Sequence, residues 1–237
     1  MLSFCHVDFA YDKPVLHDVS FALRTGMTCV LSPNAGGKST LLKLAAGLLK
    51  PQSGQILPQY KSPKIRAQNV ALLPQWNRVP ELTVYELAAH GRYPHLSAGH
   101  VLRARDKEII GAALEQTGAI AFLHRKLGEI SGGQRQKAAL AMALAQETPL
   151  LLLDEPTTYL DIKVQLELME LLQSLPNKKI LMAIHDIPLA LRFCDYAMVL
   201  RDGRLIFDGA CADLPASGAL ESAFGVTNLE RSSVHAF

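Results

Sequence analysis

Cysteine is scarce in this 237-residue chain. The four cysteines lie far apart, and no two of them form a Cys-x-x-Cys pair: Cys5, Cys29, Cys194 and Cys211. A disulfide framework or a structural zinc site would need closer, patterned spacing. We therefore expect reduced thiols of a cytosolic protein.

Long hydrophobic runs and an excess of one charge are also lacking. The longest apolar stretches, residues 138–145 and 150–153, fall well short of the roughly 20 residues that a membrane helix needs. Residues 1–14 contain acidic residues and a proline but no apolar signal-peptide core. The formal net charge is only +2, so no basic surface indicates nucleic acid. We expect a chain that neither crosses a membrane nor binds nucleic acid.

Strand-like and helix-like segments alternate along the chain. We expect strands at 2–9, 15–23, 27–31, 70–73, 150–153 and 180–184, and a hairpin at 197–207. We expect helices at 39–49, in parts of 82–126, at 131–145 and at 166–175. The unbroken leucine run at 150–153 is typical of a central parallel strand covered on both faces. The pattern predicts one α/β domain over 1–237, with a mostly helical insert at about 80–135.

A Gly-rich segment, SPNAGGKST, connects an expected strand to an expected helix, as a phosphate-binding loop requires. Its backbone N–H groups and the helix N-terminus would attract phosphates, Lys38 would neutralise them, and Ser39 would offer a hydroxyl to Mg²⁺. The candidate ligands are Ser32, Pro33, Asn34, Ala35, Gly36, Gly37, Lys38, Ser39 and Thr40. Ser32 breaks the strict G-x-x-x-x-G-K-[ST] pattern, and a simple strand-to-helix turn is the alternative.

Two adjacent acids, Asp154 and Glu155, follow the leucine run. Ligand sites of open α/β sheets gather at the carboxyl ends of the strands, so Asp154 is predicted to hold Mg²⁺. Glu155 is the candidate base that polarises an attacking water. Acids that merely cap the next helix are the alternative.

The segment Ile130-Ser131-Gly132-Gly133-Gln134 is the most specific motif of the chain. Ser131 beside two glycines at a helix N-terminus would form a second phosphate-binding surface, although a capped helix start is the plainer interpretation. With the loop and the acidic pair in this order, the chain resembles ABC-transporter ATPases from Tyr11 to about Gly209. The resemblance implies a P-loop NTPase core with a parallel central sheet, an antiparallel β subdomain and a helical insert. It also implies hydrolysis of ATP with Mg²⁺, between the phosphate loop of one copy and Ser131–Gln134 of a second.

Further roles come from this resemblance alone. It implies that Tyr11 stacks on adenine, that Gln75 senses Mg²⁺ and contacts the permease, and that Asp161 faces the second copy. It also implies that His185 lies near the γ-phosphate. The plainer interpretations are a turn tyrosine, a polar strand end, an N-capping aspartate and a structural histidine. Ala35 stands where the family usually has glycine, and a positive φ there or at Ser32 would cost roughly 1–2 kcal/mol.

The stretches Val84–Leu87, Gly91–His95, Gln134–Gln136 and Leu144–Glu147 resemble importers of iron–siderophore complexes, haem and cobalamin. This implies a separate membrane permease, contacted through the helical insert, and indirectly a substrate-binding protein. It also implies a peripheral position on the cytoplasmic face of a bacterial membrane. A soluble ABC protein of ribosomes or DNA would resemble tandem cassettes or carry a coiled-coil insert, which this chain lacks. A subunit with impaired hydrolysis is suggested by Ser32 and Ala35 but opposed by Lys38, Asp154, Glu155 and His185.

Overall fold

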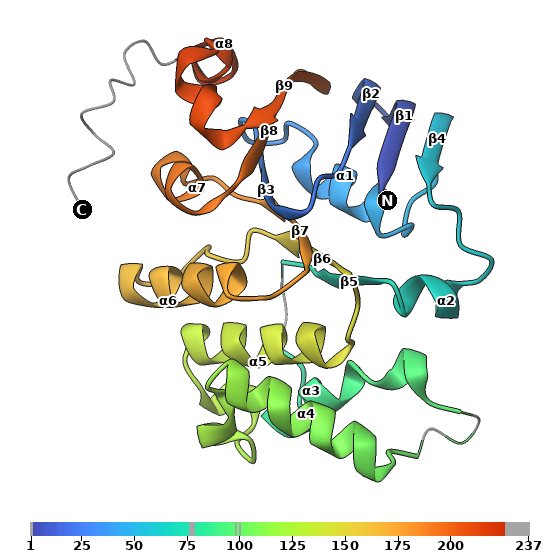
Figure 1. The fold of residues 1–237 in the computed structure, drawn as a ribbon, viewed down its shortest axis with the longest axis vertical. Helices are drawn as coiled ribbons and strands as arrows, with labels where there is room; N and C mark the ends of the chain where they lie inside the picture. Colours follow the sequence, from blue (N-terminus) through green and yellow to red (C-terminus); the bar gives the residue numbers. More distant parts are fainter. Residues whose placement is uncertain (1, 76–78, 98, 100, 226–237) are drawn as a thin grey trace. The chain divides into compact units, whose positions relative to one another are not determined.

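The computed structural model describes residues 2–75, 79–97, 99 and 101–225 (Figure 1). The strands are β1 (Ser3–Ala10), β2 (Pro14–Ala22), β3 (Gly26–Leu31), β4 (Ser53–Leu57), β5 (Val70–Leu73), β6 (Leu150–Asp154), β7 (Lys179–Ala183), β8 (Tyr196–Arg201) and β9 (Arg204–Ala210). The α-helices are α1 (Lys38–Ala45), α2 (Pro63–Ala67), α3 (Val84–His90), α4 (Ala104–Gln116), α5 (Gly132–Ala145), α6 (Ile162–Gln173), α7 (Ile187–Phe193) and α8 (Ala219–Phe224).

The strands form two sheets, and the chain divides into two compact units. One sheet has the order β2-β1-β4 and the other β5-β6-β7-β3-β8-β9. The first unit contains Met1–Gln59, Leu152–Glu155 and Leu175–Phe237, and the second contains Tyr60–Leu151 and Pro156–Ser174. The predicted limits of the helical insert, about 80–135, remain a prediction.

In the first unit, parallel strands support the loop that precedes α1. Strand β3 pairs in parallel with β7 and with β8, and β8 pairs antiparallel with β9. All residues of β3 after Gly26 are buried, because helices and loops cover both of its faces. The predicted hairpin is confirmed: Asp202 and Gly203, with φ of 49° and 72°, form its two-residue turn.

The second unit is built around α5, whose inward face is rich in buried alanines. Helix α3 begins with a capping box, in which Thr83 accepts the N–H of Glu86 and the Glu86 carboxylate accepts the N–H of Thr83. Helix α3 ends at a close backbone approach: a Cβ on Gly91 would lie 2.2 Å from the carbonyl oxygen of Met142. Glycine at position 91 is therefore required by the packing of α3 on α5.

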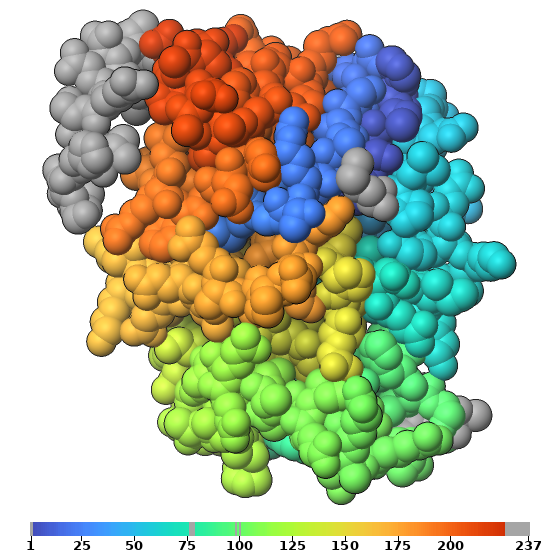
Figure 2. All heavy atoms as spheres, in the orientation of Figure 1, coloured from blue at the N-terminus to red at the C-terminus, as the bar shows by residue number. Residues whose placement is uncertain are grey.

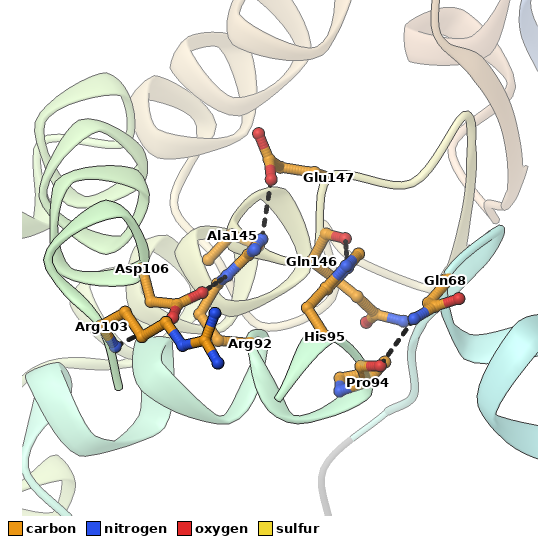
Figure 3. Close-up of polar contacts among 9 residues, drawn as sticks. All are labelled: Gln68, Arg92, Pro94, His95, Arg103, Asp106, Ala145, Gln146 and Glu147. Atoms are coloured by element: carbon orange, nitrogen blue, oxygen red, sulfur yellow. Dashed lines mark hydrogen bonds and ion pairs between the residues drawn. The ribbon is translucent and has the colours of Figure 1, made fainter. Parts of the chain in front are cut away.

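Arg92, next to that glycine, is buried among oxygen atoms (Figure 3). Its Nε donates to Asp106 at 3.0 Å, and its Nη1 donates to the Ala145 carbonyl at 2.7 Å and to Glu147 at 2.8 Å. The ring of His95 contacts the Gln146 carbonyl at 2.9 Å. The side chains of Arg92 and His95 thus form their hydrogen bonds within the second unit, with α4 and with the C-terminal end of α5. The outer side of α4 lies on the surface (Figure 2).

The expected elements are found with shifts of a few residues, and four of the strands and α-helices in the described residues were missed. Helix 131–145 and strand 70–73 are confirmed with almost their expected limits. They are β4, α2, α7 and α8, each of which has seven residues or fewer. All four cysteines are free thiols. Within the described part of the chain, no helix has the length and apolar character that crossing a membrane requires.

Candidate functional site

A hollow of about 490 Å³ opens in the first unit beside the loop between β3 and α1. Its volume lies in the range of small-molecule sites. It is lined by Tyr11, Val15, Asn34, Ala35, Gly36, Gly37, Lys38, Ser39, Thr40, Glu155 and His185. Residues from four separate parts of the sequence therefore meet at one cavity.

The phosphate loop contains a tight turn with Ala35 at its third position. The N–H of Gly36 donates to the Pro33 carbonyl at 3.1 Å and closes this turn. Ala35 has a φ of 61° and Gly37 a φ of 95°, whereas Ser32 does not have a positive φ. The penalty anticipated for a Cβ in the left-handed region, about 1–2 kcal/mol, thus applies to Ala35 and not to Ser32.

Lys38 is held inside this loop. Its Nζ lies 3.1 Å from the carbonyl oxygen of Ser32 and 3.3 Å from the hydroxyl of the same residue. The residue is 5% exposed, and burial lowers the pKa of the ammonium group, while the charges of Glu155 and Asp154 oppose that shift. A phosphate group in the hollow would supply the negative charge that favours the protonated form.

Ser39 and Asp154, both predicted to hold Mg²⁺, are in contact. The Ser39 hydroxyl donates to Oδ1 of Asp154 at 2.9 Å. Burial raises the pKa of Asp154, the hydrogen bond from Ser39 lowers it, and the neighbouring Glu155 charge raises it. A hydroxyl and a carboxylate at this distance are the hard oxygen ligands that Mg²⁺ prefers, so the residues fit the ion.

Glu155 and His185, the two predicted catalytic residues of this unit, also contact each other. Nε2 of His185 forms a hydrogen bond with Oε1 of Glu155. Glu155 has a φ of 53°, and its N–H donates to the Ala183 carbonyl of β7 at 3.1 Å. A left-handed backbone at a non-glycine residue is uncommon and gathers at functional sites. Here it directs the carboxylate of Glu155 to the hollow.

Tyr11 forms the outer wall of the hollow. The residue is 54% exposed, and the ring of Phe9 packs against its ring edge to face with centroids 4.9 Å apart. Val15, beside it, was not predicted from the sequence. A Cβ on Gly37 would lie 2.8 Å from Cδ2 of Leu16 and 3.3 Å from the Val15 carbonyl, so β2 packs directly on the loop. No motif in the sequence indicates this contact, which depends on the sheet.

The remaining predicted residues belong to the second unit. Gln75 follows β5 and is exposed. Ser131 caps α5 by accepting the N–H of Gln134 at 3.2 Å, and Gln134 accepts the N–H of Ser131 at 3.0 Å. Asp161 caps α6 by accepting the N–H of Val164 at 3.0 Å. The capping interpretations of Ser131 and Asp161 are thus confirmed.

Although Ser131 caps α5, the start of this helix is still accessible to solvent. Ser131 and Gly132 are exposed, and a Cβ on Gly132 would meet nothing nearer than 3.9 Å. Gly133 faces α6, where a Cβ would lie 3.1 Å from Cγ1 of Val164. The first of the two glycines is therefore open to solvent, and the second packs within the unit.

Comparison with known proteins gives the family. The model described as ABC transporter matches residues 16–158. The iron(3+)-hydroxamate import ATP-binding protein FhuC of Bacillus subtilis (strain 168) is 40% identical over 225 residues, which cover 91% of this chain and 84% of FhuC. The chain belongs to the ABC transporter family. As an ABC ATPase, it binds and hydrolyses ATP.

Other ABC proteins agree in sequence and in fold. The ferric enterobactin transport ATP-binding protein FepC of Escherichia coli (strain K12) is 37% identical, with 84% of this chain and 77% of FepC covered. The dimeric structure of MJ0796, a bacterial ABC transporter cassette, has a TM-score of 0.78 and 26% identity, with 89% of this chain and 99% of MJ0796 covered. MJ0796 is also known as a dimer in a post-hydrolysis state bound to ADP and Pi. The expected fold and ATPase class are confirmed.

Proposed function

We propose that this ATPase powers the uptake of a metal chelate, of the iron–siderophore, haem or cobalamin class, through a separate permease. The observation that carries the substrate class is the likeness to FhuC and FepC, whose names give iron–hydroxamate and ferric enterobactin as their cargo. We propose that the cargo is selected by the partner proteins and not by this chain. In this proposal the chelate passes through the permease.

In the proposed site, ATP lies in the 490 Å³ hollow. The adenine stacks on Tyr11, an exposed aromatic platform supported by Phe9, and base stacking of this kind is worth about 1–3 kcal/mol. The triphosphate follows residues 32–40, with its terminal phosphates at Lys38. Burial of Lys38 supports this assignment, because a desolvated ammonium gains more from a nearby anion than an exposed one does.

Glu155 is proposed as the base that orients the attacking water. His185 is proposed to position the carboxylate of Glu155. Their direct contact supports a joint role. Ser39 and Asp154 are proposed to hold Mg²⁺, and the role of Gln75 towards this ion stays a prediction from the family resemblance. When bound, this ion neutralises charge that develops on the β- and γ-phosphates.

The second half of each nucleotide site is proposed to come from another copy of the chain. Ser131–Gln134 would bind the γ-phosphate of the partner copy through a hydroxyl, backbone N–H groups and the start of α5. The exposure of Ser131 and Gly132 supports this arrangement, as does the dimeric form of MJ0796. Asp161 would face the partner copy while it caps α6.

The proposed assembly contains two copies of this chain, transmembrane permease subunits and, indirectly, a substrate-binding protein. We place the chain on the cytoplasmic face of a bacterial membrane, as a peripheral subunit that contacts the permease through its helical insert. The description of FhuC and FepC as import or transport ATP-binding proteins supports a separate membrane component.

Deleting the gene tests the substrate class. We expect the deletion strain to lose growth on one iron–siderophore, haem or cobalamin source, and to regain it with the wild-type gene but not with Lys38→Ala. Uptake of the same chelate, measured with a radioactive metal, should follow growth. If uptake of a sugar, amino acid or phosphate fails instead, the substrate class is wrong, although the ATPase assignment stands.

A further inference from the structure

Two residues of the phosphate loop stand where glycine is usual, and one backbone oxygen connects them. The carbonyl of Pro33 accepts the N–H of Gly36 at 3.1 Å and the hydroxyl of Ser32 at 2.9 Å. The first bond closes the turn that contains Ala35, and the second fixes the oxygen on which that turn closes. Ser32 and Ala35 therefore contribute to the same local structure.

Ala35 weakens this turn. Its φ of 61° is readily adopted by glycine, which has no Cβ, and by asparagine, whose side chain can hydrogen-bond locally, but it is unfavourable for alanine. Other loop conformations, with Ala35 at negative φ, thereby become more accessible. Any contact that holds the turn in place gains importance, because binding a triphosphate requires the backbone N–H groups to stay aligned.

Ser32 supplies such a contact and a second one. Its side chain is buried within the loop, where a Cβ on Gly36 would lie 2.5 Å from the Ser32 hydroxyl oxygen. The hydroxyl also accepts a hydrogen bond from Nζ of Lys38 at 3.3 Å, beside the bond of 3.1 Å to the Ser32 carbonyl. With glycine at position 32, the ammonium group of Lys38 would keep only the hydrogen bond to the backbone carbonyl of that residue.

We propose that Ser32 is a positioning residue for Lys38, and that its hydroxyl compensates for Ala35 by holding the turn from Pro33 to Gly36. The two departures from glycine then act as a coupled pair. This inference rests on the nucleotide site proposed above. It concerns residues of this chain alone and is independent of the transported molecule.

A double-mutant cycle on the full-length protein tests the coupling. A fluorescent ATP analogue is titrated into wild type, Ser32→Ala, Ala35→Gly and the double variant, and the KM and kcat of ATP hydrolysis are measured for each. We expect Ser32→Ala to weaken binding by about tenfold with Ala35 present and by less than about threefold with glycine there. KM should rise with little change in kcat, because Lys38 loses alignment before the chemical step.

Two controls separate positioning from general damage. Ser32→Cys keeps the size of the side chain but hydrogen-bonds weakly, so it should behave like Ser32→Ala. Ser217→Ala removes another hydroxyl of the first unit, one that donates to the Leu214 carbonyl at 2.7 Å, and should leave both constants unchanged. Equal effects of Ser32→Ala in the two backgrounds would overturn the coupling. A lower kcat at constant KM would overturn the role of Ser32 in positioning Lys38 for binding. If wild-type protein fails to bind the analogue, the proposed nucleotide site fails instead.

Discussion

Replacing Arg92 with alanine should destabilise the protein strongly, because this side chain holds three oxygen atoms at once. The Arg92 side chain is 5% exposed and that of Asp106 11%, so both charges are largely removed from water. Breaking a buried pair by removing one partner costs about 3–5 kcal/mol. The Ala145 carbonyl also loses its hydrogen bond at 2.7 Å. We therefore expect the free energy of unfolding to fall by roughly 3–5 kcal/mol, measured by urea denaturation.

Two comparisons make this test specific. Glu147, the third partner, has a side chain that is 45% exposed, so Glu147→Gln should cost less than about 1 kcal/mol. The N–H of Arg103, and after it Arg92, holds the pKa of Asp106 below its usual value, against the effect of burial. The lowered pKa stabilises the fold above about pH 4 and loses this effect as pH falls further, so the difference between wild type and Arg92→Ala should shrink in acid. A loss under 1 kcal/mol at pH 7 would refute this account of Arg92.

Three further outcomes are expected. Ser32→Gly combined with Ala35→Gly should change the affinity for a fluorescent ATP analogue by less than about tenfold, and a gain of about a hundredfold would mean that the native loop is compromised. Gly91→Ala should destabilise the fold by about 3 kcal/mol in thermal or urea unfolding, because its Cβ would meet a carbonyl at 2.2 Å. Gly111→Ala, in α4 with nothing within 4 Å, should instead stabilise by up to about 1 kcal/mol, and equal effects of the two would contradict the packing described.

Much of the fold could be predicted because local signals and tertiary structure agree. The leucine run at 150–153 is a fully buried strand, and Ser131 begins α5 as its capping pattern predicts. Strand β4 was missed because its residues are mostly exposed and its sequence, SGQIL, has no alternating pattern. It is a strand because β1 pairs with it, which is a contact between distant residues.

Part of the candidate site could likewise be predicted from the sequence, and part needed the structure. The spacing of Lys38, Asp154 and Glu155 from their strands predicted that they would meet, because parallel strands end at one edge of a sheet. The sequence left open the sign of φ at Ser32 and Ala35. A backbone angle depends on the whole loop, so the structure was needed to assign the strain to Ala35. The hydrogen bonds of the Ser32 hydroxyl could not be predicted from the sequence either, because serine is compatible with many turns.

Glu155→Gln tests the central claim most directly. The variant keeps the size of the side chain but cannot act as a base, so ATP should still bind while hydrolysis falls by at least about 10²-fold. Because the bound ATP persists between two copies, light scattering should detect a stable dimer with ATP and a monomer without it. Hydrolysis at the wild-type rate would contradict the role of Glu155, and ATP binding without a dimer would contradict the shared site.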